Sequence, residues 1–182
     1  MADGTLKVGT ITTSSGSGTI TLGQSGETVN VSGAAGTGFG KILQVVFATT
    51  TTQVNNNTTS YTDTNLTASI TPSSTSNKIY VIVNQANKLQ EASASGGSSI
   101  KILRDSTTIY GGDEGYENFL SIGGASSVQR YDRNNLNFLD TPSSTSSLTY
   151  KTQARAYNAG DIISCQPESI KSTITLMEIA GW

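Results

Sequence analysis

The sequence predicts an all-β protein, built as an antiparallel β-sandwich or jelly roll. Ser, Thr, Gly and Asn are abundant, whereas the strong helix formers Ala, Leu, Glu and Lys are sparse outside short stretches, which favours strands over helices. About eight short apolar or alternating runs are separated by turn residues, at the spacing typical of sandwiches and jelly rolls. The third observation is a repeat, since TPSSTS at Thr71–Ser76 returns at Thr141–Ser146.

Each copy of this repeat ends one strand-like run and begins another. Its proline fixes φ and pushes the preceding threonine into an extended conformation, and the hydroxyl groups that follow can bond nearby backbone groups. Each copy is therefore expected to form a rigid strand-to-strand corner. Two matching corners predict a duplicated step in the path of the chain. The alternative is a chance repeat in a chain rich in Ser and Thr.

Residues 1–38 are predicted to form a β-rich attachment arm. Between Thr5 and Ser32, pairs of apolar residues alternate with turns of Gly and Ser, a pattern of short strands. Such strands cannot bury their small apolar faces alone, so they should lie on a partner or wind around copies of themselves. A disordered arm is the alternative. The predicted attachment residues are Leu6, Val8, Ile20, Leu22, Val29 and Val31.

Residues 39–182 are predicted to form the sandwich, or head. Lys41–Phe47 is apolar on both faces, as in a central strand. Tyr61–Ile70 alternates and ends at the first corner. Lys78–Val83 again carries apolar groups on both sides, so one face should meet the core and the other a further surface.

The second half of the head begins with a predicted hairpin, in which Ile100–Arg104 pairs with Thr107–Tyr110 across a turn at Asp105–Ser106. A long connection with a weak strand near Phe119–Ile122 follows. The remaining strands are expected at Val128–Tyr131, Leu136–Asp140, Leu148–Tyr157, Asp161–Cys165 and Ser172–Ile179. In the last of these, Ile174, Leu176 and Ile179, with Trp182 behind them, are expected to join the core or a subunit interface.

The chain is poor in apolar residues. Their fraction is 35%, and counting the 19 Gly in place of the 7 Tyr gives about 42%, against roughly 45–50% for ordinary globular chains. Part of the stabilisation is therefore expected to come from a neighbouring subunit. Together with the strands that are apolar on both faces, this predicts a homotrimer.

Charge and hydropathy exclude several classes of partner. The formal net charge is −2, with 13% charged residues and no cluster of Lys or Arg, which does not suit nucleic acid. No apolar run approaches the roughly 20 residues of a membrane span, and Met1–Gly4 lacks the start of a signal peptide. We therefore expect synthesis and retention in a cytosol before assembly. The single cysteine, Cys165, is expected to be an inert packed thiol.

The residues offer little for catalysis. The chain contains no His, which removes the commonest general base and metal ligand. A pair of carboxylates could still serve glycoside hydrolysis, but loop carboxylates are usually solvated, and we predict no enzymatic activity. The carboxylates in question are Asp113, Glu114, Glu117, Asp132 and Asp140.

Two weaker ligand sites are also suggested. Asp113, Glu114, Tyr116 and Glu117 form a candidate ligand or cation loop, but their spacing matches no defined calcium loop, so no metal or cofactor is predicted. Aromatic residues beside carboxylates and amides could instead line a sugar-binding surface, or simply be core and interface residues. These aromatics are Tyr110, Tyr116, Phe119 and Tyr131.

The segment Ser14–Val31, SSGSGTITLGQSGETVNV, resembles a module that recurs near the start of structural proteins of marine and freshwater bacteriophages. The rest of the chain resembles virion proteins of the same, cyanophage-like phages, described as fibre-like or structural. The stretches that carry this resemblance are Gly40–Val45, Ile70–Ile79, Leu103–Asp105, Asn137–Asp140 and Ser172–Gly181.

The resemblance implies a trimer with a jelly-roll head and a short β-rich attachment segment, and it brings no catalytic residues. A tail fibre normally has a long shaft, so the short arm favours a capsid decoration protein or short head fibre. It would be assembled in the host cytoplasm and lie on the virion surface, with itself and the major capsid protein or another virion protein as partners. The alternative is a tail-fibre or receptor-binding tip that recognises a host surface glycan.

Overall fold

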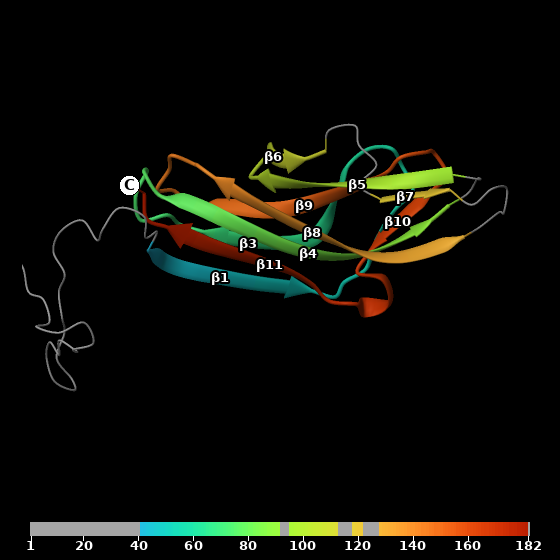
Figure 1. The fold of residues 1–182 in the computed structure, drawn as a ribbon, viewed down its shortest axis with the longest axis horizontal. Coiled ribbons are helices and arrows are strands. Elements are labelled where there is room, and N and C mark those ends of the chain that lie inside the picture. The colour runs from blue at the N-terminus through green and yellow to red at the C-terminus, as the bar shows by residue number, and fades with distance from the viewer. Residues whose placement is uncertain (1–40, 92–94, 113–117, 122–127, 182) are drawn as a thin grey trace, which may run out of the picture. The chain divides into compact units, whose positions relative to one another are not determined.

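The computed structural model describes residues 41–91, 95–112, 118–121 and 128–181. All of these lie in the second of the chain's two units, Gly40–Trp182. Within them, the strands form two antiparallel sheets that face each other (Figure 1). No helix of the described part has the length and apolar character needed to cross a membrane.

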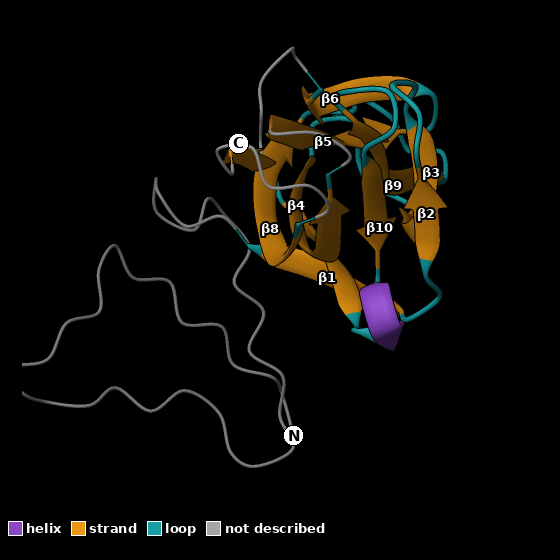
Figure 2. Cartoon of the chain, turned by 90° about the vertical axis from the view of Figure 1, so that its right-hand side faces the viewer, coloured by secondary structure: helices purple, strands orange, loops and turns teal. Residues whose placement is uncertain are grey.

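Sheet A provides one layer of the sandwich and sheet B the other. The strands of sheet A are β1 (Ile42–Thr50), β2 (Val54–Asn56), β4 (Lys78–Gln90), β8 (Gln129–Asp140), β10 (Ile162–Cys165) and β11 (Ser172–Ile179). Those of sheet B are β3 (Thr62–Ile70), β5 (Ser95–Arg104), β6 (Thr107–Gly111), β7 (Asn118–Ser121) and β9 (Leu148–Ala156). A single turn of 3-10 helix, η1 (Pro167–Ser169), separates β10 from β11 (Figure 2).

The strand pairing is that of a jelly roll. The antiparallel pairs β5–β6, β4–β8, β3–β9 and β1–β11 are nested around the turn at Asp105–Ser106, so the chain is one long hairpin folded into two sheets. Eight strands of the described residues remain when the short β2 is left out, β6 and β7 are counted as one interrupted strand, and β10 and β11 as another. Numbered along the chain, these eight strands have the order 1-8-3-6 in sheet A and 2-7-4-5 in sheet B. This confirms the predicted all-β sandwich and selects the jelly roll from the two alternatives.

The two copies of the repeated hexapeptide lie on the two legs of this hairpin. Ile70 pairs with Leu148 in sheet B, and Ile79 pairs with Asp140 in sheet A. Thr71–Ser76 and Thr141–Ser146 therefore cross between the sheets at the same place, in opposite directions. Both are corners, as predicted, and the duplicated step is explained by the pairing of the two legs.

The core lies between the sheets and follows the alternation of each strand. Its fully buried side chains come from both layers: Leu66, Ile79, Val81, Ile100, Ile102, Tyr150, Ile163, Ile174 and Leu176. At about 25 cal/mol per Å² of apolar surface removed from water, these side chains are the main source of stability. Val46 and Ala48 of β1 pack against this cluster from the edge.

A buried polar network also joins the two sheets. Thr152 of β9 donates to Oε1 of Gln85 on β4 at 3.0 Å, and the Nε2 of Gln85 donates to the hydroxyl of Ser172 at 3.1 Å. Ser172 also accepts a bond from Gln166 at 2.9 Å. Because buried polar groups are costly when unpaired, this network favours one register between the layers.

The structure corrects the prediction that Lys41–Phe47 is a central strand. Its strand, β1, is at the edge of sheet A and, among the described residues, pairs only with β11. The alternation places Val46 and Ala48 toward the core and Val45 and Phe47 outward. Apolar residues on both faces therefore reflect an exposed apolar surface here, rather than a strand between two neighbours.

Two further expectations are corrected. Val128–Tyr131 and Leu136–Asp140 belong to one continuous strand, β8, because the polar stretch between them pairs with β4 without interruption. Ile174 and Leu176 are buried in the core as predicted. Ile179 lies on the same face of β11 as Thr173 and is only partly buried, so it is not part of the core, and its place in a subunit interface stays a prediction. Ile179 is three positions after the buried Leu176, and successive side chains of a strand point to opposite faces, so Ile179 points outward. Trp182 lies outside the described residues.

Candidate functional site on the outer face of sheet A

An apolar band crosses the outer face of sheet A. In one row, Val45, Met177, Tyr80 and Leu139 stand opposite one another on β1, β11, β4 and β8. In the next row, Phe47, Thr175, Ile82 and Asn137 do the same. We define the apolar band as Val45, Phe47, Met177, Tyr80, Ile82 and Leu139.

The band is exposed where it is most hydrophobic. Phe47 is 62% exposed, Val45 55% and Leu139 42%, and the three belong to the two edge strands β1 and β8. None of the six side chains carries a charge. Single exposed apolar residues are normal on a protein surface, but a continuous patch is typical of an interaction site.

The pleat of the strands explains how the sequence builds this band. The neighbours of the band residues on β4 and β11, such as Ile79, Val81 and Leu176, are fully buried in the core, and those on β1 and β8, Val46 and Phe138, are partly buried. Each strand thus carries core residues on one face and band residues on the other. The sequence indicated this surface through Lys78–Val83 but did not show that Leu139 and Met177 complete it, because their contribution depends on strand order.

The site residues predicted from sequence lie outside the described residues. This holds for the attachment residues Leu6, Val8, Ile20, Leu22, Val29 and Val31, and for the candidate ligand loop Asp113, Glu114, Tyr116 and Glu117. Phe119 lies in β7, whose backbone alone is described. These predictions therefore stay predictions.

The two described carboxylates of the hydrolase hypothesis are held by neighbouring side chains. Asp140 forms an ion pair with Arg104 at 2.6 Å and accepts a hydrogen bond from the hydroxyl of Tyr150 at 2.7 Å. Asp132 pairs with Arg130 at 2.8 Å. In the described part of the chain, no group of three or more His, Cys, Asp or Glu side chains is arranged to hold a metal ion.

The other described candidates have separate surroundings. Tyr110 packs against Phe138 with ring centroids 5.6 Å apart, whereas Tyr131 lies on the outer face of sheet A at the far end of β8. Cys165 is buried, which raises the pKa of its thiol to about 12. The packed thiol predicted from sequence is therefore confirmed.

Comparison with known proteins gives distant structural likenesses. No family model matches the chain, and no curated protein does. The VP2 subviral particle of infectious bursal disease virus is 12% identical, with a TM-score of 0.39 over 77% of this chain and 39% of that one. T=1 particles derived from infectious bursal virus give 15% identity and a TM-score of 0.37, covering 77% and 37%.

A third likeness is to dimeric latent PorU from Porphyromonas gingivalis. It is 10% identical, with a TM-score of 0.31 over 78% of this chain and 14% of that one. The chain therefore spans less than two fifths of each of these three proteins.

Proposed function

We propose that the chain is a non-enzymatic structural protein of a bacteriophage virion, and that it assembles as a homotrimer through the apolar band. The observation that carries this proposal is the exposed band itself, on the outer face of a jelly-roll sheet. Jelly rolls are common in viral capsid proteins and in lectins. The resemblance of the sequence to phage structural proteins favours the first class.

A second copy of this chain suits the band better than an unrelated partner. In a closed trimer, identical residues of the three copies approach one another close to the threefold axis. Like charges there would repel, and the band has none. Burial of its exposed side chains between copies would remove further apolar surface from water, which the small core of one chain provides only in part. The outer edge of β1 lies beside the band and pairs with no other described strand, so a neighbouring copy can cover both.

Substitutions in the band test this interface. Phe47→Asp and Val45→Asp place a charge on an exposed surface of the single chain, so they should leave its fold intact while dissociating the trimer. Thr62→Asp, at an exposed position of β3 in sheet B, is the matched control and should stay trimeric. Light scattering measures the assembly, and circular dichroism the fold. If the two band variants remain fully associated, the interface lies elsewhere.

We assign attachment to the virion to Thr5–Val31, whose apolar pairs lack a core of their own. Changing Leu6, Val8, Ile20 and Leu22 together to Ser should yield a folded protein that no longer joins phage particles. Full incorporation of this variant, measured by mass spectrometry of purified particles, would place the anchor elsewhere.

Within the virion, we favour a capsid decoration protein or short head fibre. The alternative is a tail-fibre or receptor-binding tip that recognises a host surface glycan. The number of copies in each particle separates the two roles, because decoration of a capsid needs many copies and a tail tip needs few. Quantitative mass spectrometry and immunogold labelling of purified particles measure that number and its position.

A further inference from the structure

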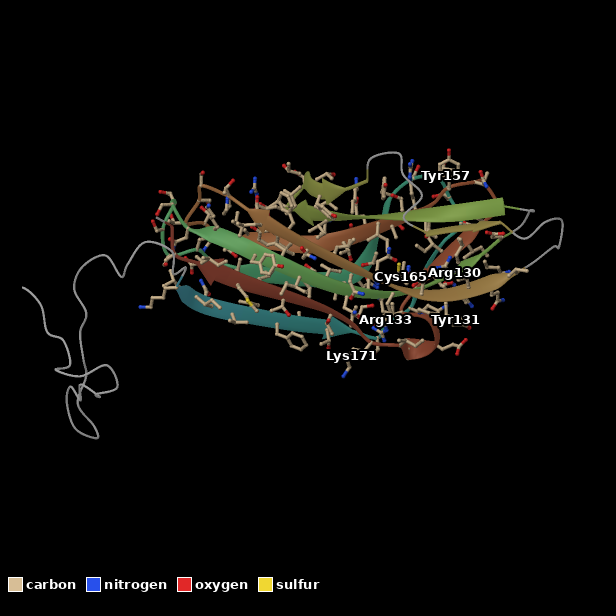
Figure 3. The ribbon with its side chains drawn as sticks, in the orientation of Figure 1. Arg130, Tyr131, Arg133, Tyr157, Cys165 and Lys171 are labelled. Atoms are coloured by element: carbon tan, nitrogen blue, oxygen red, sulfur yellow. The ribbon has the colours of Figure 1, made fainter. Side chains whose placement is uncertain are left out.

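A pocket opens on the outer face of sheet A where β10 gives way to β11. It has a volume of about 260 Å³ and is lined by Ala86, Asn87, Tyr131, Asp132, Arg133 and Ile170. Ala86 pairs with Arg133 across β4 and β8, and Ile170 follows η1. Tyr131, Arg133 and the neighbouring Lys171 are labelled in Figure 3.

The pocket is separate from the apolar band. On β4, the pocket residue Ala86 follows the band residue Ile82 by four positions, which corresponds to roughly 13 Å at the usual strand rise. On β8, Tyr131 and Leu139 are eight positions apart, or roughly 26 Å. Assembly through the band therefore leaves room for a ligand in the pocket.

Arg133 is the charged group that the pocket offers to a ligand. Its Nη1 donates to Oδ1 of Asn84 at 2.5 Å and to the carbonyl oxygen of Lys171 at 3.2 Å, which fixes the guanidinium group. It forms no ion pair within the described residues, unlike Arg130, which pairs with Asp132. The remaining donors, Nε and Nη2, suit the two oxygens of an incoming carboxylate.

Tyr131 supplies a fixed aromatic wall. Its hydroxyl is hydrogen-bonded to the carboxylate of Glu168 on η1, and the ammonium group of Lys88 lies 5.6 Å from the ring centroid. The side chain is nevertheless 48% exposed. With Ala86 and Ile170, it gives the pocket an apolar lining beside two charged side chains, Arg133 and Asp132, of which Asp132 is paired with Arg130. An apolar lining with a few polar groups is typical of small-molecule sites.

We propose that this pocket binds an acidic sugar, such as a uronic acid unit of a bacterial surface polysaccharide. The carboxylate would pair with Arg133, and the ring would lie against Tyr131. The volume of about 260 Å³ is just below the roughly 300–1,000 Å³ of pockets for drug-sized ligands, so it suits one sugar ring. Lys88, Arg130, Arg133 and Lys171 lie at the site together with two carboxylates, Asp132 and Glu168. Positive charge therefore exceeds negative charge locally and favours an anion, although the whole chain has a net charge of −2. This site goes beyond the proposed structural function, which does not require it.

Titration of the full-length protein with methyl glucuronide, methyl glucoside and acetate tests the proposal. Calorimetry and saturation-transfer NMR should detect methyl glucuronide with a dissociation constant on the order of millimolar, as expected for so small a ligand. Methyl glucoside lacks the carboxylate, so the loss of its charge-assisted bonds should weaken binding about tenfold or more. Acetate lacks the ring and its contact with Tyr131, so it should also bind about tenfold more weakly or worse.

Variants locate the site. Arg133→Gln and Tyr131→Ala should each weaken glucuronide binding by about tenfold or more. Lys41→Gln removes one positive charge beside Ala180, at the end of β11 away from the pocket, so it should leave the affinity nearly unchanged. Thermal melting checks that each variant is folded.

Several results would overturn the proposal. Absence of saturable glucuronide binding to the unmodified protein would do so without any variant. Equal affinities for methyl glucoside and methyl glucuronide would show that Arg133 does not bind the carboxylate. Acetate binding as tight as that of glucuronide would show a bare carboxylate site, of the kind that takes an acidic side chain of a neighbouring protein. Equal losses in the Lys41 and Arg133 variants would show that the affinity reflects the overall charge of the protein rather than a contact with Arg133.

Discussion

Glu178 near the end of β11 accepts two hydrogen bonds from Ser73 of the first corner, from the backbone N–H at 2.6 Å and from the hydroxyl at 2.8 Å. Asn77 and Gln44 each donate a further bond to the same carboxylate at 2.6 Å. Glu178 is 1% exposed. One buried carboxylate therefore ties the corner that joins the two sheets to the strands β1 and β11.

These bonds predict an acid-sensitive contribution to stability. Burial alone would raise the pKa of Glu178, but the bonds from Gln44, Asn77 and Ser73 outweigh it and lower the pKa from 4.5 to about 2. Because the folded-state value is depressed, the contribution is fully present above about pH 4.5 and is lost as the pH falls toward 2. A shift of this size corresponds to about 3 kcal/mol.

Glu178→Gln should therefore destabilise the protein at pH 7 by about 2–3 kcal/mol, and it should flatten the pH dependence between about 4.5 and 2. Urea unfolding at a series of pH values measures both effects. If the variant loses as much unfolding free energy between about pH 4.5 and pH 2 as the unmodified protein, another carboxylate is responsible for the acid sensitivity.

The closing strand provides a comparison between its two faces. Leu176 is fully buried in the core, so Leu176→Ala should cost roughly 2–5 kcal/mol and lower the melting temperature by several degrees. Thr173→Ala, on the outward face of the same strand, should change it little. Equal small effects would mean that β11 is an exposed edge, contrary to its place between β1 and β4.

The buried polar network predicts a cost for an almost isosteric change. Thr152→Val removes the hydroxyl that donates to Gln85 and leaves that buried oxygen underbonded, which should cost about 1–3 kcal/mol. Thr149→Val, at an outward position near the start of β9, breaks an exposed bond to Ser69 that water can replace. Chemical unfolding measures the free energy of unfolding of both variants. Comparable losses would show that the buried network contributes no more to stability than an exposed hydrogen bond.

Burial should make the thiol of Cys165 unreactive in the folded protein. Its pKa is raised to about 12, so little thiolate exists at pH 8, and the side chain is only 2% exposed. A thiol reagent should label the protein rapidly in denaturant and hardly at all without it. Rapid labelling under native conditions would show that β10 opens readily.

Local sequence patterns predicted most of the strands and both corners. Alternation along Tyr61–Ile70 and the turn at Asp105–Ser106 depend on neighbouring residues, and the structure places β3 and the β5–β6 hairpin there. The position of Lys41–Phe47 at a sheet edge could not be predicted in this way, because an apolar outward face looks the same whether a strand or a subunit covers it.

The candidate sites were harder to predict because they depend on strand order. The apolar band gathers residues from β1, β4, β8 and β11, and the pocket brings Ala86, Arg133 and Ile170 together from distant parts of the chain. Arg133 carried no signal in the sequence, since an isolated arginine in a polar stretch is usually solvated. Its fixed position beside Tyr131 follows from the β4–β8 register and from the break between β10 and β11.

The molar mass of the full-length protein in solution tests the central claim most directly. Three chains of 19.0 kDa each give about 57 kDa, and light scattering at micromolar concentration should report this mass, with Phe47→Asp reduced to a single chain. The charge added by Phe47→Asp falls on an exposed side chain, so the dissociated variant should keep its β-sheet circular dichroism. A folded unmodified protein with the mass of one chain would contradict assembly through the apolar band.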